Sequence, residues 1–353
     1  MPRPTKTSRE YLEYQADRIE SVLAAHRVPA RVAGGAVSPR WLRYEVAAGA
    51  SARIATVRNL SEEIALALGA DQARVTRQGN VLAVEVPRPD PEPVTLRRML
   101  PLLSSVPPVT AVLGLSELGR PLLIRLPSPD VAHILVAGTT GSGKTELLRT
   151  LLLSLALTNR PAQVQFVLID PKQRGLGPLA QIPHCLFPLM SDPQQAGRVL
   201  AQLVTKMERR DRTQVNTPHI VIAVDEVLDL MMTGGSAVMT ALTRLAQRGR
   251  EAGIHLVLGA QKPSSTVFDG QLKANFPVRL VGRVVSADDA RIAAGIGGTG
   301  AEKLLGRGDF LAVSANSVTR FQAAHVPQSD WRYLLQAIRM QRPLVGQPEE
   351  TVQ

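Results

Sequence analysis

A glycine-rich stretch that follows an apolar run is the first part of the sequence with recognisable chemistry. Residues 138–145 read Gly-Thr-Thr-Gly-Ser-Gly-Lys-Thr, fit the pattern G-x-x-x-x-G-K-[ST], and stand where a strand is expected to pass into a helix. The glycines let backbone N–H groups curl around phosphate oxygens, and the helix N-terminus adds positive potential. We expect Lys144 to reach the β- and γ-phosphates and the Thr145 hydroxyl to bind Mg²⁺. The residues predicted to hold the phosphates are Gly138, Thr139, Thr140, Gly141, Ser142, Gly143, Lys144 and Thr145.

An acidic pair follows a second apolar run. The segment HIVIAVDEVLDLMM places Asp225 and Glu226 at the carboxyl end of an expected strand. Asp225 can hold the Mg²⁺, and Glu226, one residue on, can polarise an attacking water. Two carboxylates in succession favour hydrolysis over a slow nucleotide switch, and the alternative is an exposed acidic pair after a core strand. The two methionines that close the segment, Met231 and Met232, are assigned to the core.

A glutamine ends a third apolar run. In IHLVLGAQKPSS the uncharged amide of Gln261 could sense the γ-phosphate or orient water, and the alternative is a surface glutamine. The sequence contains no Asn-Lys-x-Asp segment of the kind that reads guanine, so adenine is the better assignment for the base. The predicted ligands are therefore ATP and Mg²⁺.

The elements that must position these residues are short apolar runs alternating with longer helical segments. Runs that are apolar throughout indicate strands buried on both faces, and their alternation with helices indicates a mainly parallel sheet covered on both sides, an α/β fold. A smaller α+β module precedes it, with a helix over 8–27, a helix over 59–69 capped by Asn59 or Ser61, and strands over 41–48, 73–77 and 80–86. The runs assigned to the larger sheet are 133–138, 164–170, 220–226, 254–261, 278–285 and 310–315.

Prolines and changes of pattern suggest the domain boundaries. Four prolines between positions 87 and 93 make a stiff segment poor in backbone donors. The predicted organisation is an N-terminal helix (1–29), a small α+β domain (30–92), a linker leading into the large domain (93–130), the large α/β domain (131–335) and a C-terminal tail (336–353).

The charge of the chain favours an anionic partner. Lys and Arg exceed Asp and Glu by 41 to 30, a net charge of +11 with a pI near 10.4. Nucleic acid is the leading candidate and a membrane surface the second, while a solvated basic face explains the charge equally well. One cysteine fits a reducing cytoplasm. The most apolar helical stretch, 147–157, is far shorter than the roughly 20 residues that a bilayer requires, so no membrane segment is expected.

Ordered segments beyond these motifs give the chain a family resemblance. From about Trp41 to Val326 it resembles the motor region of the FtsK/SpoIIIE double-stranded DNA translocases through HILVAGTTGSGKT, VLIDPK, IPHCLFPLMSD, KMERRDR, VIAVDEVLDLMM, LAQRGREAGIHLVLGAQKPS, LKANFPVRL and AEKLLGRGDFL, in that order. The resemblance implies a RecA-like P-loop NTPase, a homo-oligomeric, hexameric ring around duplex DNA, and ATP hydrolysis between subunits that drives the duplex through the pore. It covers the motor, without the membrane spans or winged-helix module of long family members.

A hydrolysis site between subunits needs a positive charge supplied in trans. Arg250 is the favoured candidate and Arg248 the other, although either could simply cap the end of its helix. Candidate contacts to the DNA backbone are Lys172, Lys273 and Arg279, each of which is equally consistent with a solvated or subunit-bridging charge.

Three functions are compatible with these features. The first is an ATP-driven motor that moves double-stranded DNA in chromosome, plasmid or phage transfer, with Glu226, Lys144, Gln261 and Arg250 as catalytic residues. The second is a polypeptide-secretion ATPase of the related type, whose chains usually carry several motor domains, whereas this chain has one P-loop. The third is a non-hydrolysing, nucleotide-dependent DNA-binding regulator, and Glu226 argues against it.

Overall fold

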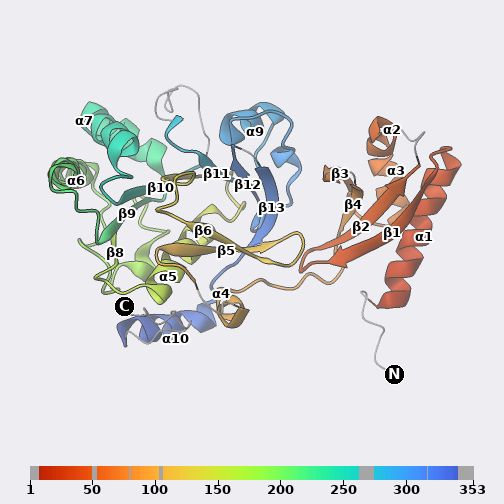
Figure 1. Cartoon of the computed structure of the whole chain (residues 1–353), viewed down its shortest axis with the longest axis horizontal. Helices are drawn as coiled ribbons and strands as arrows, with labels where there is room; N and C mark the ends of the chain where they lie inside the picture. Colours follow the sequence, from red (N-terminus) through yellow and green to blue (C-terminus); the bar gives the residue numbers. More distant parts are fainter. Residues whose placement is uncertain are drawn as a thin grey trace. The chain divides into compact units, whose positions relative to one another are not determined.

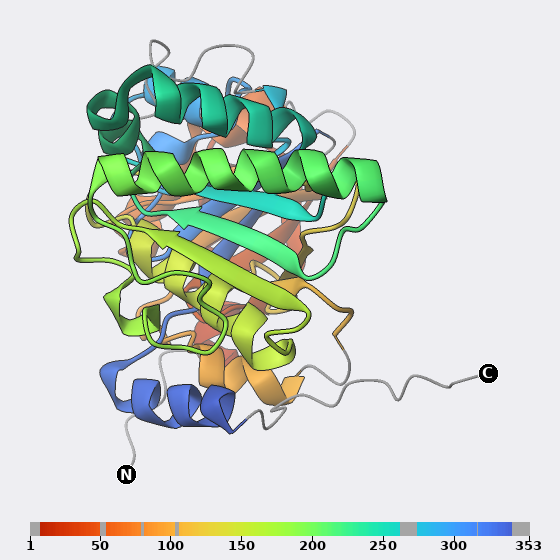
Figure 2. The same cartoon turned by 90° about the vertical axis from the view of Figure 1, so that its left-hand side faces the viewer.

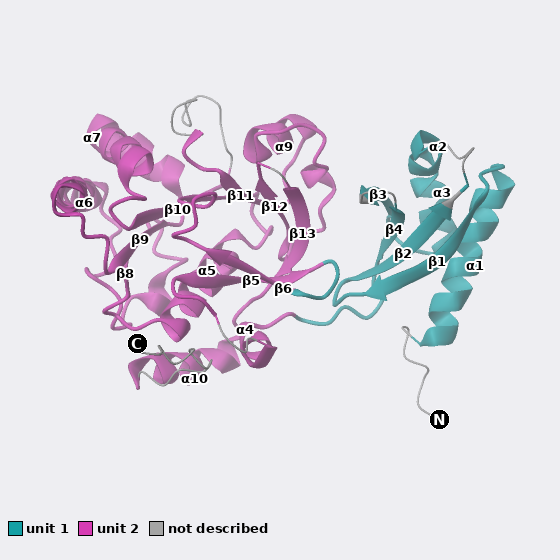
Figure 3. Ribbon diagram, viewed as in Figure 1, with its two compact units in different colours: residues 1–93, 117–120 teal, residues 94–116, 121–353 magenta. Residues whose placement is uncertain are grey.

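The chain forms two compact units. The computed structural model describes residues 8–49, 54–78, 81–102, 106–261, 274–315 and 317–340. The smaller unit comprises residues 1–93 and 117–120, and the larger unit comprises residues 94–116 and 121–353 (Figure 3).

The smaller unit is a four-stranded antiparallel sheet packed against helices. The strand order is β1-β2-β4-β3, and three helices, α1, α2 and α3, complete the unit. Ile19 and Leu23 lie four residues apart on α1, so both enter the core of this unit, and α1 belongs to it. The cap expected at Asn59 or Ser61 was wrong, because α3 follows Leu60 and no side chain caps it. The elements are α1 (Arg9–Ala25), β1 (Ala30–Val37), β2 (Trp41–Ala48), α2 (Ile54–Asn59), α3 (Ser61–Leu68), β3 (Arg74–Gln78) and β4 (Val81–Pro87).

The larger unit is built on a nine-stranded sheet of order β6-β5-β13-β12-β11-β7-β10-β9-β8. The strands from β11 to β8 pair in parallel, as expected for buried apolar runs between helices. Helix α5 packs in the hydrophobic core on one face of this sheet, and α6 and α7 lie side by side over the opposite face of the sheet (Figure 2). These elements are β7 (Ile134–Ala137), α5 (Lys144–Thr158), β8 (Val164–Ile169), α6 (Pro193–Thr213), β9 (His219–Val224), α7 (Val227–Arg248), β10 (Ile254–Ala260) and β11 (Val278–Val281).

The other side of the sheet is antiparallel, and part of it comes from a segment predicted to be a linker. Residues 93–130 carry α4, β5 and β6, and β5 pairs with β13 and β6 (Figure 1). Prolines at 107, 108 and 121 obscure these strands in the sequence. The expected tail, 336–353, likewise includes the end of α10. The elements are α4 (Leu96–Met99), β5 (Thr110–Ser116), β6 (Pro121–Arg125), α9 (Ala287–Ala294), β12 (Asp309–Ser314), β13 (Ser317–Ala323) and α10 (Gln328–Arg339).

Within the described parts of the chain, every helix is too short or too polar to cross a lipid bilayer.

Candidate nucleotide-binding site

The glycine-rich turn connects β7 to α5 as its sequence predicts. Gly141 and Gly143 adopt φ of 82° and 101°, values that a residue with a side chain rarely takes, and Gly143 is the N-cap of α5. The turn opens onto a cavity of about 250 Å³. The cavity is lined by Thr139, Thr140, Gly141, Gly143, Lys144, Thr145, Glu146 and Gln261.

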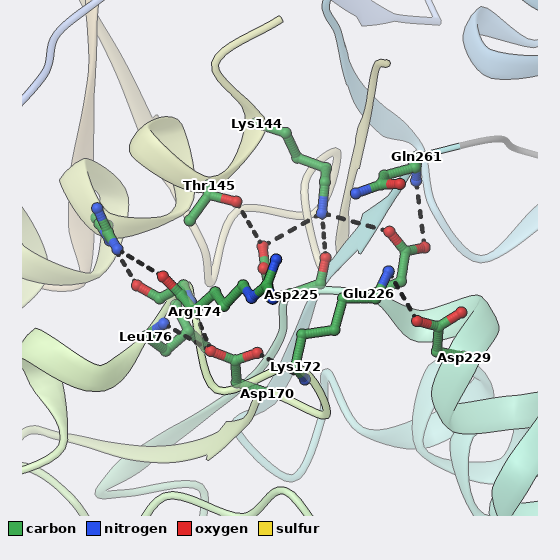
Figure 4. Close-up of polar contacts among 12 residues, drawn as sticks. Lys144, Thr145, Asp170, Lys172, Arg174, Leu176, Asp225, Glu226, Asp229 and Gln261 are labelled. Carbon is green, nitrogen blue, oxygen red and sulfur yellow. Dashed lines mark hydrogen bonds and ion pairs between the residues drawn. The ribbon is translucent and has the colours of Figure 1, made fainter. Parts of the chain in front are cut away.

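The acidic pair meets this turn because β9 and β7 both flank β10 and all three strands are parallel, so their carboxyl ends share one edge. Lys144 Nζ donates to the backbone oxygen of Asp225 and lies 3.2 Å from its Oδ1 (Figure 4). The same Nζ lies 3.7 Å from Glu226 Oε2. The lysine and both carboxylates are buried, so Lys144 is shared between two acidic groups in the unliganded site.

Thr145 and Asp225 provide a pair of oxygen atoms suited to Mg²⁺. Thr145 Oγ1 donates to Asp225 Oδ1 at 3.0 Å. Mg²⁺ is usually held by one or two carboxylates together with substrate phosphates, and not by a cage made only of protein. A cluster of three or more His, Cys, Asp or Glu side chains suited to a metal is absent from the described residues.

Glu226 has the environment of a base. Burial raises the pKa of its carboxyl group, while Lys144 and a hydrogen bond from the Gln261 backbone partly oppose the rise. That bond runs from Gln261 N to Oε1 at 3.2 Å. The other oxygen, Oε2, has no hydrogen-bond partner among the described residues. The sequence predicts a role for the side-chain amide of Gln261, and the structure adds that its main chain orients Glu226.

A loop after β8 packs against Asp225, a contact that the P-loop and acidic motifs do not indicate. The fully buried Asp170 accepts hydrogen bonds from Gly175 N at 2.7 Å and Leu176 N at 3.0 Å. The loop brings Gly175 so close to Asp225 that a β-carbon on it would lie 2.6 Å from Oδ2. The available signal was the segment VLIDPK, whose strand ends at the same edge of the sheet as β9.

Of the three candidate DNA contacts, Lys172 lies beside this site, where its charge favours the charged form of Glu226. Lys172 Nζ forms a 2.9 Å ion pair with Asp229 Oδ2 in the first turn of α7, and a hydrogen bond to Asp229 raises the pKa of the lysine. Arg279 lies on β11, where its Nε donates to Phe276 O at 3.4 Å. Lys273 lies outside the described residues.

The two candidate trans arginines lie away from the P-loop of their own chain. Arg248 donates to Asp211 Oδ2 of α6 at 2.7 Å, whereas Arg250 has only Glu251 at 3.8 Å as an ion-pair partner in the described residues. Both precede β10, and Gln261 follows it. Seven residues of strand span about 23 Å, so neither side chain reaches the cavity.

The assignment of Met231 and Met232 to the core is confirmed for one residue and wrong for the other. Met231 is buried as expected, but Met232 is 76% exposed. Consecutive residues on a helix point about 100° apart, so only one of them faces the core.

The P-loop and its cavity lie at the carboxyl edge of covered parallel strands. This arrangement places the chain in the class of P-loop ATPase folds. By structure it is similar to the pCW3 conjugation coupling protein TcpA solved with ATPγS, with a TM-score of 0.63, 18% identity, and coverage of 93% of this chain and 100% of that one. It is also similar to the cytoplasmic domain of the Thermomonospora curvata type VII secretion ATPase EccC, with a TM-score of 0.59, 23% identity, and coverage of 73% and 35%. Likeness at this level establishes the fold.

Sequence comparison identifies the family. The model of the FtsK/SpoIIIE family matches residues 101–214 and 210–265, and that of the FtsK alpha domain matches residues 1–88. The chain is 34% identical, over an alignment 373 positions long, to the DNA translocase FtsK of Lactiplantibacillus plantarum, covering 96% of this chain and 46% of that protein. The chain belongs to the FtsK/SpoIIIE family and spans about half the length of that relative.

Proposed function

We propose that this chain is an ATP-hydrolysing motor that moves double-stranded DNA. The observation that carries the proposal is the position of Glu226, next to Asp225 and 3.7 Å from the P-loop lysine, in a chain whose relative is named a DNA translocase. A carboxylate placed there suits hydrolysis, because it can orient and deprotonate a water molecule.

The described residues divide the chemical work among them. Lys144 and the backbone N–H groups of the P-loop bind the phosphates, and the Thr145 and Asp225 oxygens hold Mg²⁺. When bound, Mg²⁺ neutralises charge on the phosphates. Glu226, held at Oε1 by the Gln261 backbone, takes the proton of the attacking water at Oε2. The Gln261 side chain lines the same cavity and contacts the γ-phosphate or that water.

The motor works as a homo-oligomeric ring, which we propose to be hexameric. Arg250 lies too far from its own cavity to act there, and its weak pairing with Glu251 leaves it available to a neighbouring subunit. The net charge of +11 suits the sequence-independent attraction to phosphates that a motor on DNA needs. Lys172, Lys273 and Arg279 remain the proposed contacts to the DNA backbone.

Polypeptide secretion is the main alternative. The type VII secretion ATPase shares the fold at 23% identity, whereas the DNA translocase is 34% identical along nearly the whole chain. The closer relationship favours DNA as the substrate. A non-hydrolysing regulator would have no use for a buried base at Glu226.

The test is ATP turnover by the purified chain, measured alone, with long duplex DNA and with an unfolded polypeptide. Stimulation by duplex DNA, together with displacement of a triplex-forming strand from the duplex, is the expected result. Affinity for DNA should also fall by about a thousandfold between about 50 and 200 mM salt if six or more phosphates are contacted. Stimulation by polypeptide alone would support secretion, and absence of turnover under every condition would overturn the proposal.

A further inference from the structure

A tight turn from another part of the chain supports the P-loop from behind. Arg307 N donates to Gly141 O at 2.9 Å, and Gly308 N donates to Ser142 O at 2.7 Å. The contact is close, because a β-carbon on Gly143 would lie 2.8 Å from Gly308 N. The turn lies in the segment AEKLLGRGDFL, none of whose side chains lines the nucleotide cavity.

These two hydrogen bonds fix the orientation of the P-loop peptide groups that face the nucleotide cavity. In a trans peptide the carbonyl and the N–H of the next residue point in opposite directions. A donor bound behind Ser142 O therefore turns the Gly143 N–H to the opposite side, and Gly143 lines the cavity. Dipoles that are oriented before the ligand arrives need no reorganisation when it binds.

The turn needs external support, because its backbone is unfavourable. Gly306, Arg307 and Gly308 have φ of 73°, 50° and 92°, and the left-handed region is sparsely populated for a residue such as arginine. Such a conformation persists only where the surrounding structure holds it.

A buried ion pair supports the turn through its neighbouring residue Asp309. Arg320 on β13 donates to both carboxylate oxygens of Asp309, at 2.9 and 2.8 Å, and their side chains are only 4% and 1% exposed. Asp309 Oδ2 also accepts from Leu305 N at 2.9 Å, which closes the turn. Gln322 Nε2 donates to Arg307 O at 3.0 Å and holds the other side of the turn.

We propose that Asp309, Arg320 and Gln322 are positioning residues for nucleotide binding: through the turn at 305–308 they hold the P-loop peptides in the orientation that receives phosphate. The inference rests on the proposed function to the extent that the P-loop binds ATP. A buried ion pair often adds no more stability than a well-packed apolar pair of the same volume, so stability alone does not account for Asp309 and Arg320. The pair instead fixes the geometry of the turn at 305–308.

Two variants test the proposal. Gln322→Met removes one donor to the turn from a half-buried side chain, and Asp309→Leu with Arg320→Met replaces both charges together so that neither is left buried alone. Thr319→Val, on the same strand and away from the turn, is the matched control. The readouts are the Kd for ATPγS by calorimetry, KM and kcat for ATP, and the unfolding temperature without nucleotide.

We expect both variants to fold and to bind nucleotide more weakly than the wild type. Because the phosphates are held in both the ground and transition states, KM and Kd should rise together while kcat changes little. Loss of one hydrogen bond corresponds to a change of about threefold to tenfold for Gln322→Met, and about tenfold or more is expected for the double variant. The control should match the wild type.

Wild-type nucleotide affinity in the folded double variant would overturn the proposal. If the double variant does not fold, Gln322→Met is the deciding test. An unchanged Kd for ATPγS in that variant would also overturn the proposal. If the wild-type chain itself does not bind ATPγS, the failure lies with the proposed function and not with the support of the P-loop.

Discussion

Replacing Glu226 with glutamine removes one negative charge from the site and nearly preserves its shape. The variant keeps an oxygen that can accept the bond from Gln261 N, but it loses the charge that lies 3.7 Å from Lys144 Nζ. A missing general base lowers turnover by about a hundredfold to ten thousandfold, which is about 3 to 5 kcal/mol of transition-state stabilisation. Binding of ATPγS should survive, because Lys144 and the P-loop amides are unchanged.

The same substitution should not destabilise the unliganded protein. At 3.7 Å and an effective dielectric constant of about 20, the two charges attract by about 4.5 kcal/mol before desolvation, which costs several kcal/mol for each buried ion. Burial nevertheless raises the pKa of Glu226, so desolvation outweighs the attraction. The raised pKa means that this carboxyl stabilises the fold below its ordinary pKa, and that the stabilisation is lost as pH rises through the folded-state pKa. Near neutral pH the wild-type carboxyl has lost this stabilisation, whereas glutamine is neutral at every pH. The substitution should therefore leave the free energy of unfolding unchanged or raise it.

The assays are steady-state ATP hydrolysis with saturating duplex DNA, calorimetric binding of ATPγS, and thermal unfolding at pH 7. We expect turnover to fall at least a hundredfold, with unchanged ATPγS affinity and an unfolding temperature equal to or above that of the wild type. Hydrolysis at the wild-type rate would refute the assignment of the base. An unfolding temperature lowered by many degrees would refute the electrostatic argument.

Three further substitutions test the contacts around the site. Lys144→Ala leaves two buried carboxylates without their cation, so both ATPγS affinity and the unfolding temperature of the unliganded protein should fall; unchanged values would contradict the observed ion pairs. Arg250→Ala should abolish turnover alone, but mixing it with Lys144→Ala should restore part of the activity, since one chain supplies the P-loop and its neighbour the arginine. No recovery at any mixing ratio would argue against action in trans. Asp170→Asn loosens the loop beside Asp225 and should lower kcat by about tenfold with a smaller change in ATPγS affinity, and an unaltered kcat would show that the loop has no part in turnover.

The sequence by itself determined the parts of the site that depend on local spacing. Glycine, lysine and threonine at fixed intervals specify the P-loop, because one turn and the first turn of one helix bring all of them to the phosphates. Asp225 and Glu226 could be added because apolar runs of strand length indicated parallel strands, whose carboxyl ends share an edge. The α/β fold class followed from the same alternation.

Only the tertiary structure decided which distant residues support that site. Asp309 and Arg320 are eleven residues apart on two antiparallel strands, and the turn they hold reaches the P-loop more than 150 positions earlier in the chain. The linker that proved to contain β5 and β6 shows the same limit, since their partners are each other and β13, about 200 residues away. Local patterns report the preferred conformation of a segment, but side-chain and strand pairing depend on where the folded chain brings the partner, and no spacing in the sequence records that distance.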